Sequence, residues 1–231
     1  MTIAQMTPFI SFEGTEGVGK TTAISHLCNR LQEQGIDFVR TREPGGSQFS
    51  ERLRQILLDP QSQIHDDSEL LLMFAARSDH LAQLILPALH EGKWVICDRF
   101  TDSTIAYPGL GRMMDTHDNT HDNTHDNNNR SAESHQQQLA KIQTLTDLFV
   151  PRLPDMTFWL DLPVRDGLAR ACKRSVADRF EQQTVAFFER VYQGYDYLAN
   201  KYPKRIYRID ASGTAEQVAM RIWACVSNSK F

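Results

Sequence analysis

A glycine-rich octapeptide carries the clearest chemical signature in this sequence. Residues 14–21 read Gly-Thr-Glu-Gly-Val-Gly-Lys-Thr and match the pattern G-x-x-x-x-G-K-[ST]. The segment follows the apolar run Phe9–Phe12 and precedes a helical pattern over Thr21–Gln34, which is the context that a phosphate-binding loop requires. The backbone N–H groups of such a loop and the positive end of the helix dipole surround phosphate oxygens. We therefore predict the site of a donor nucleoside triphosphate here.

Two side chains of this loop are expected to act on the triphosphate. Lys20 supplies a point charge to the β- and γ-phosphates, and the Thr21 hydroxyl is a ligand for Mg²⁺. A chance match in a glycine-rich turn is the alternative, and both flanking patterns argue against it. The residues predicted to contact the donor nucleotide are Gly14, Thr15, Glu16, Gly17, Val18, Gly19, Lys20, Thr21 and Thr22.

The guanine-recognition motif of switch GTPases is missing from the sequence. The only Asn-Lys pair, Asn200-Lys201, continues as Tyr202-Pro203 and lacks the Asp of the N-K-x-D motif. The loop is therefore more typical here of a phosphotransferase than of a switch GTPase.

Two further segments favour a phosphotransferase. Asp98 and Arg99 follow an apolar run, where the carboxylate can hold the hydration shell of Mg²⁺ and the guanidinium can bind an acceptor phosphate. A salt bridge at the end of a strand is the alternative for this pair. Residues 168–179 carry Arg170, Lys173, Arg174 and Arg179 with little acid between them. This cluster predicts a lid over the transferring group, and a solvated basic helix face is its alternative.

Five short apolar runs alternate with longer helical patterns along the chain. The alternation predicts an α/β fold with a parallel five-stranded sheet and helices on both faces, as in P-loop NTPases. Ligands of such folds bind at the carboxyl ends of the strands. The predicted strands are Phe9–Phe12, Phe38–Thr41, Trp94–Cys97, Met156–Leu160 and Ile206–Ile209. The predicted helices are Thr21–Gln34, Leu70–Leu89, Phe180–Lys201 and Ala215–Val226.

Composition limits the classes of partner. The chain has 231 residues, 41% of them hydrophobic, and a formal net charge of −4, so bulk attraction to nucleic acid or to an anionic membrane is not expected. No apolar stretch is long enough to span a membrane, and the N-terminus does not resemble a signal peptide. The four cysteines form no C-x-x-C pair. These features predict reduced thiols and a cytoplasmic protein that binds neither nucleic acid nor membrane.

One segment departs from the globular pattern. The tetrapeptide Thr-His-Asp-Asn occurs three times in residues 116–127, and residues 116–131 contain no apolar side chain. We expect a mobile surface insertion over residues 115–131 rather than a metal site built from its histidines. The predicted organisation is a single domain, residues 1–231, with this insertion and a lid at about residues 168–179.

Several motifs together resemble the bacterial thymidylate kinases over nearly the whole chain. Besides the phosphate-binding loop, the resemblance rests on Phe12-Glu13-Gly14, residues 41–46 (TREPGG), residues 74–77 (FAAR), Asp98-Arg99-Phe100, Ser103, Ala106-Tyr107, Gly109, Gly111-Arg112, Asp178-Arg179 and Phe187-Phe188. Departures from the family pattern are Pro108 in place of Gln, Ser175 in place of Gly, and the repeat. The resemblance implies a nucleoside monophosphate kinase fold, transfer of the γ-phosphoryl group of ATP to dTMP for dTTP synthesis, a need for Mg²⁺, and a homodimer.

The resemblance also implies roles for residues on the acceptor side. Phe74 would stack on the thymine ring, with core packing as its alternative, and Arg77 would donate to thymine O4. Tyr107 would pack against the sugar and exclude a 2′-hydroxyl. The residues expected to bind the acceptor are Glu16, Arg42, Pro44, Phe74, Arg77, Arg99, Ser103 and Tyr107.

The catalytic cations are expected to be Lys20, Arg99 and Arg174. Some family members carry an Arg at the position of Gly17, and its absence here resembles the class whose catalytic Arg lies in the lid. Arg174 is the first choice, before Lys173 and Arg170. An Arg placed at position 17 is expected to restore part of the rate lost in an Arg174 variant.

Two alternatives from other functional classes stay open. A deoxynucleoside kinase needs a carboxylate base for a neutral hydroxyl, and Glu43 is the candidate. A regulatory nucleotide-binding module is the second alternative. ADP release with dTMP, with thymidine, with dUMP and without an acceptor distinguishes them from a dTMP kinase.

Overall fold

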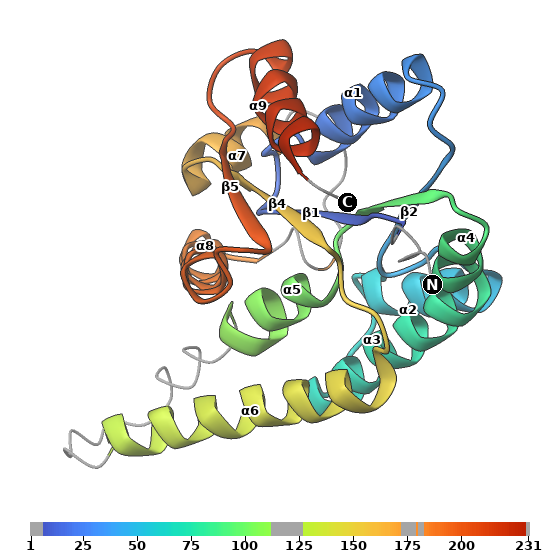
Figure 1. The fold of residues 1–231 in the computed structure, drawn as a ribbon. Coiled ribbons are helices and arrows are strands. Elements are labelled where there is room, and N and C mark those ends of the chain that lie inside the picture. The colour runs from blue at the N-terminus through green and yellow to red at the C-terminus, as the bar shows by residue number, and fades with distance from the viewer. Residues whose placement is uncertain (1–6, 112–126, 172–178, 180–182, 230–231) are drawn as a thin grey trace.

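The fold is given by a computed structural model that describes residues 7–111, 127–171, 179 and 183–229, with side chains for all of these except residues 127–135. The elements follow one another as a regular alternation of strands and helices, drawn in Figure 1.

A five-stranded parallel sheet lies at the centre, in the order β2-β3-β1-β4-β5. This confirms the predicted α/β class. The strands are β1 (Phe9–Glu13), β2 (Phe38–Arg42), β3 (Trp94–Asp98), β4 (Met156–Asp161) and β5 (Ile206–Asp210). Each strand extends one residue beyond its predicted end, and each added residue is charged. The sheet therefore presents a row of charged side chains at its carboxyl edge, where ligands of this fold bind.

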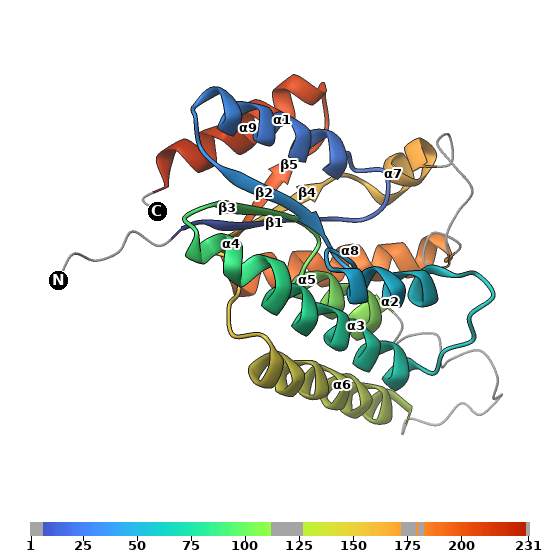
Figure 2. The same ribbon diagram turned by 90° about the vertical axis from the view of Figure 1, so that its right-hand side faces the viewer.

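Helices cover both faces of the sheet, as predicted (Figures 1 and 2). On one face α1 (Lys20–Glu33) packs beside α9 (Ala215–Asn228). The other face is covered by α3 (Asp66–His80) and α8 (Val185–Lys201), with shorter helices between them, and α6 (Asn127–Phe149) packs against α3 on the side away from the sheet. The sheet is consequently buried on both sides, which explains why its strands read as continuous apolar runs.

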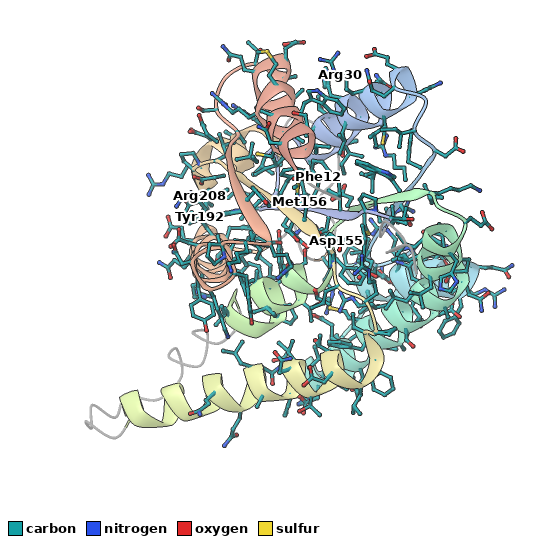
Figure 3. All side chains as sticks on the ribbon, viewed as in Figure 1. Phe12, Arg30, Asp155, Met156, Tyr192 and Arg208 are labelled. Carbon is teal, nitrogen blue, oxygen red and sulfur yellow. The ribbon has the colours of Figure 1, made fainter. Side chains whose placement is uncertain are left out.

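The side chains of β1 alternate between these two layers. Ile10 and Phe12 join the core under α1 and α9, together with Met156 (Figure 3). Phe9 points to the other side, where its ring meets the ring of Phe100 edge-on at 4.9 Å. Because β1 is packed between two dense cores, the first residue of the phosphate-binding loop has a well-defined position.

The predicted helix Leu70–Leu89 is longer and less regular than expected. It consists of α3, a π-helical segment η1 (Leu81–Ile85) and α4 (Leu86–His90). Pro87 lies at the start of α4 and has no backbone N–H to donate within a helix. The wider π-helical turns of η1 accommodate the missing N–H donor, so that α3, η1 and α4 follow one another without a break.

Two helices correct the predicted boundaries of loops. The chain between β2 and α3 forms α2 (Gln48–Leu58), which the sequence analysis did not assign. The predicted insertion 115–131 is wrong as a loop over residues 127–131, because α6 begins at Asn127. The later part of α6 is anchored by the buried Ile142 and by an ion pair between Lys141 and Asp67, and a polar sequence can extend such a helix. The preceding repeat residues, 116–126, lie outside the described residues.

Helix α8 begins later than predicted. Its first residue is Val185, because the Thr184 hydroxyl accepts the N–H of Phe187 and caps the helix there. Between β3 and the repeat, α5 (Thr101–Thr104) continues into the π-helical segment η2 (Ile105–Gly111), which packs against α8. These elements place Ser103 and Tyr107 beside the ends of β1 and β3.

Candidate functional site

The phosphate-binding loop joins β1 to α1, as predicted. The Lys20 amine donates to the carbonyl oxygens of Gly14 at 3.0 Å and of Thr15 at 3.1 Å, inside the curve of the loop. Burial, and then the positive charge of Arg99, lower the pKa of this amine. A phosphate that entered the loop would relieve this unfavourable environment, because it would supply the negative charge that a buried ammonium lacks.

Three predicted side chains meet at the carboxyl ends of β1 and β3. Arg99 Nη2 lies 2.5 Å from Glu16 Oε1 and donates to the Tyr107 hydroxyl at 2.9 Å. The Tyr107 hydroxyl in turn donates to Glu16 at 3.0 Å, and its ring lies under the Arg99 guanidinium at 4.6 Å. Among the described residues, Arg99 forms its ion pair with the loop carboxylate of Glu16 and not with the adjacent Asp98, which was the alternative.

A cavity of about 340 Å³ extends from the phosphate-binding loop to α3. Most of the predicted site residues form its wall, namely Glu16, Gly17, Val18, Gly19, Lys20, Thr21, Arg42, Pro44, Arg77, Asp98, Arg99, Ser103 and Tyr107. Gly14, Thr15 and Thr22 are not on this wall. The cavity therefore connects the expected donor side with the expected acceptor side.

Arg77 is held rigidly at the acceptor end of the cavity. Its Nε donates to Glu43 Oε2 at 2.7 Å, and its Nη2 donates to the Phe100 carbonyl at 3.2 Å and to the Thr104 hydroxyl at 2.9 Å. Nη1 is buried and has no hydrogen-bond partner within the described part of the chain. Buried donors of folded proteins are nearly always bonded, so this atom is a donor available to an acceptor that enters the cavity.

Phe74 is not brought to the cavity. Its side chain is 2% exposed and belongs to the core cluster that contains Leu70, Ile85 and Phe100. Its ring lies 5.1 Å from the Arg77 guanidinium, so it packs behind that residue. The structure thus shows the core packing that was the alternative for Phe74, and Met73 and Phe100 reach the wall instead.

Glu43 belongs to a buried network that the sequence analysis missed. Its second oxygen, Oε1, lies 3.1 Å from His80 Nδ1, and His80 Nε2 lies 2.7 Å from the Thr41 hydroxyl. Both carboxylate oxygens are therefore engaged, one by Arg77 and one by His80. Glu43 is thus placed to orient Arg77 at the cavity wall. The sequence offered one sign of this network, the carboxylate between Arg42 and Pro44. Its partners could not be identified from local sequence, because they lie on a helix more than thirty residues away.

The loop after β2 shapes the acceptor side. Arg42 pairs with Glu51 of α2 at 2.9 Å, and Arg54 of α2 donates to the Pro44 carbonyl at 2.7 Å. Arg54 also lines the cavity, which sequence reasoning did not anticipate because α2 itself was not assigned.

Gly17 makes a backbone contact that corrects one expectation. Its φ is 71°, and a Cβ there would lie 1.8 Å from the carbonyl oxygen of Gly167 in α7 (Val164–Ala171). A Cβ on Gly167 would likewise lie 2.4 Å from the Glu16 carbonyl oxygen. An Arg at position 17 has no room beside α7 in this arrangement, so it is not expected to replace a lid Arg.

The predicted lid is described only in part. Arg170 is exposed at the end of α7, whereas Lys173 and Arg174 lie outside the described residues. Arg179 forms an ion pair with Glu69 of α3, and its Nε donates to the Leu57 carbonyl at 3.0 Å. Arg179 is thus held in a structural pair with α3.

Two features of other protein classes are absent from the described residues. These residues contain no group of three or more His, Cys, Asp or Glu side chains that resembles a metal centre. None of the helices in this part of the chain is long and apolar enough to cross a membrane.

Comparison with known proteins agrees with this geometry. The family profile described as thymidylate kinase matches residues 12–124 and 132–222, and the gap between the two stretches falls within the predicted insertion. A thymidylate kinase of Psychrobacter sp. (strain PRwf-1) is 62% identical over 219 residues, which are 95% of this chain and 96% of the relative. A thymidylate kinase of Acinetobacter baylyi is 45% identical over 212 residues, 91% of this chain and 94% of the relative.

A solved structure shares the fold as well. The crystal structure of thymidylate kinase from Ehrlichia chaffeensis superposes with a TM-score of 0.70 at 31% identity, over 95% of this chain and 98% of that one. With a phosphate-binding loop, an acceptor cavity and these relatives in agreement, the chain belongs to the thymidylate kinase family and phosphorylates dTMP to dTDP with ATP.

Proposed function

We propose that the cavity holds both substrates, with the ATP phosphates in the loop of residues 14–21 and dTMP between Arg99 and Arg77. The supporting observation is the buried, unpartnered Nη1 of Arg77 at one end of a cavity that has Lys20 at the other. A thymine carbonyl supplies the acceptor that this nitrogen lacks. Cytosine would place its amino group there, and two hydrogen-bond donors would then face each other. Arg77 therefore also contributes to base selection.

The phosphate of dTMP is assigned to Arg99, with Arg42 and Ser103 around it. The nucleophile is then a phosphate oxygen that is already anionic at neutral pH, so the reaction needs no general base. Catalysis consists of alignment and of charge neutralisation around the transferring phosphoryl group. Lys20 and Arg99 provide positive charge on the two sides of that group, and Arg174 is proposed to provide the remainder.

Magnesium is proposed as the metal partner of ATP. Thr21 and Asp98 offer a hydroxyl and a carboxylate oxygen on the cavity wall. This small set of hard oxygen donors suits Mg²⁺, which keeps several waters and binds substrate phosphates instead of filling a protein cage. When bound, the ion neutralises charge on the β- and γ-phosphates. Within the site, Thr21 and Asp98 would hold and orient it.

The acceptor assignment is tested by coupled measurement of ADP release. The rate is followed with dTMP, dUMP, dCMP and thymidine, and without an acceptor. We expect fast turnover with dTMP, slower turnover with dUMP and only background with the other three. Turnover with thymidine that equals turnover with dTMP would overturn the assignment of the acceptor phosphate to Arg99.

The Tyr107 ring is expected to set the preference for deoxyribose. Replacing Tyr107 by Ala removes the surface that excludes a 2′-hydroxyl, so kcat/KM for ribothymidine monophosphate should rise relative to that for dTMP by about tenfold or more. The Tyr107→Phe variant is the matched control. It loses the hydroxyl that bonds Glu16 and Arg99 but keeps the ring, so dTMP binding should weaken while sugar selectivity persists. An unchanged ratio in the Ala variant would leave Tyr107 a packing residue only.

A homodimer formed through α2 and α3 is also proposed. These adjacent helices expose Phe49, Ile56 and Leu71, which are about half accessible to solvent. Light scattering during gel filtration should give twice the chain mass, and Leu71→Arg should shift it toward the monomer. A monomeric mass for the unaltered chain would contradict the proposal. The cytoplasm is the proposed compartment, because both substrates are intracellular nucleotides.

A further inference from the structure

Glu13 is a buried carboxylate to which the proposed chemistry gives no role. It is the last residue of β1, it is fully buried, and it accepts three hydrogen bonds. The backbone N–H of Phe100 donates to Oε1 at 2.7 Å. The hydroxyl groups of Ser103 and Tyr195 donate to Oε2 at 2.5 Å and 2.9 Å.

Each of these three donor residues also fixes the position of part of Arg99, either its backbone or its guanidinium. Phe100 is the next residue in the chain, and its anchored N–H fixes the peptide that follows Arg99. The backbone of Arg99 has φ 67°, a left-handed conformation that a bulky residue rarely adopts without support from its surroundings. The Ser103 and Tyr195 hydroxyl groups lie 3.4 Å and 3.3 Å from Arg99 Nη1.

We propose that Glu13 is a positioning residue that fixes both the backbone and the guanidinium of Arg99 for the acceptor phosphate. The inference rests on the proposed role of Arg99 in binding that phosphate. Glu13 itself touches neither substrate, and it acts only through the residue that does.

The negative charge of Glu13 explains how the two hydroxyl groups are oriented. A hydroxyl has one proton, and both Ser103 and Tyr195 direct theirs to the carboxylate. Their lone pairs are then free to accept the Nη1 protons of Arg99. Glu16 and Tyr107 accept from Nη2 on the other side, so the guanidinium is held at both of its terminal nitrogens.

The isosteric Glu13→Gln variant reverses the direction of the two hydrogen bonds at Oε2. Its amide group has a carbonyl for the Phe100 N–H but presents an NH₂ where Oε2 stood. The hydroxyl groups of Ser103 and Tyr195 must then accept from that NH₂, and their protons compete with those of Arg99. We expect KM for dTMP to rise about tenfold, equivalent to about 1.4 kcal/mol, while KM for ATP changes less than about twofold.

Asp155 provides a matched control, because it anchors the opposite end of β1 from Glu13. It lies just before Met156 of β4 (Figure 3), accepts the backbone N–H of Phe9 at 2.8 Å, pairs with Arg152 at 2.6 Å and does not line the cavity. Asp155→Asn removes the same charge from another strand-anchoring carboxylate. It should leave KM for dTMP unchanged even where it lowers thermal stability.

A pH profile separates positioning from packing. Burial, and then the charge of Asp102 on α5, raise the pKa of Glu13 to about 7, while Arg99 acts in the opposite direction. Lys20 at the start of α1 and Tyr195 on α8 also face this carboxylate. Below pH 7 the protonated Glu13 loses acceptor capacity, so KM for dTMP should rise as pH falls. The difference between the unaltered enzyme and Glu13→Gln should therefore be large at pH 8 and shrink toward pH 6.

A double-mutant cycle with Arg99→Ala decides the inference. If Glu13 acts through Arg99, the added Glu13→Gln change should have almost no further effect on KM for dTMP in the Arg99→Ala background. Full additivity, or an equal rise in KM for both substrates, would overturn the inference. An Arg99→Ala variant with normal KM for dTMP would instead overturn the proposed role of Arg99 itself.

Tyr195→Phe keeps the inference testable if Glu13→Gln does not fold. That variant retains the ring, which stacks on Trp159 with centroids 6.3 Å apart, and removes only the hydroxyl shared by Glu13 and Arg99. KM for dTMP should rise by about threefold, and this rise should vanish in the Arg99→Ala background. A normal KM in the folded Tyr195→Phe variant would contradict the inference.

Discussion

Replacing Lys20 by Ala should reduce kcat for dTMP phosphorylation by about 10²–10³-fold, because the transferring phosphoryl group loses a positive charge inside a buried loop. The amine already lies within the loop, bonded to the carbonyl oxygens of Gly14 and Thr15, so little rearrangement separates it from a bound phosphate. The fold should persist, since a buried ammonium with a lowered pKa costs stability in the absence of substrate.

Lys93→Ala is the matched control for this prediction. Lys93 is a half-exposed lysine whose partner, Glu91, lies two residues away and outside the cavity. Its removal should leave kcat unchanged. The measurement is steady-state ADP release together with circular dichroism of both variants. A folded Lys20→Ala variant that keeps more than about a tenth of the normal turnover would refute the role assigned to the lysine.

Replacing Arg174 by Ala should reduce kcat by about 10³-fold with little change in KM for dTMP. Such a pattern indicates an interaction made mainly in the transition state, when charge spreads over the equatorial oxygens of the phosphoryl group. The loop of residues 14–21 carries one lysine and no arginine, so further positive charge has to come from another segment. Arg174 stands in the basic stretch that follows α7, and α7 packs against the loop at Gly17.

Two neighbours of Arg174 serve as controls. Arg170 is exposed on α7, and Arg170→Ala should keep kcat within about threefold of normal. Lys173→Ala should also be mild. If Arg174→Ala stays within about threefold of normal while either control loses activity, the catalytic cation has been assigned to the wrong residue. Gly17→Arg is not expected to rescue Arg174→Ala, because Gly167 occupies the space beside position 17.

The sheet was predictable from sequence because each strand is an apolar run between two buried layers. Each prediction ended one residue early, because hydrophobicity stops there while backbone pairing continues. The residues left out are Glu13, Arg42, Asp98, Asp161 and Asp210. Hydrophobicity reports burial, whereas the strand ends where the ladder of backbone hydrogen bonds ends. Two of these charged residues, Arg42 and Asp98, line the cavity, so part of the error falls where ligands are expected to bind.

The contacts within the site were less predictable than its residues. Most of the predicted residues lie on one cavity wall, because they follow strands whose carboxyl ends meet. Phe74 does not, since the face that a helix turns toward a ligand depends on packing that spacing alone does not fix. The bonds of Glu13 to Phe100, Ser103 and Tyr195 span 87 to 182 residues of sequence, and no local pattern reveals them.

The contact between Gly17 and Gly167 makes the residue allowed at one position depend on the residue at the other. Neither residue can gain a side chain while the other keeps its backbone place, so variation at the two sites has to be correlated across descendants of this chain. A directed-evolution library that randomises only position 17 should return glycine among its active clones. Larger residues there should emerge only when α7 is allowed to vary in the same library.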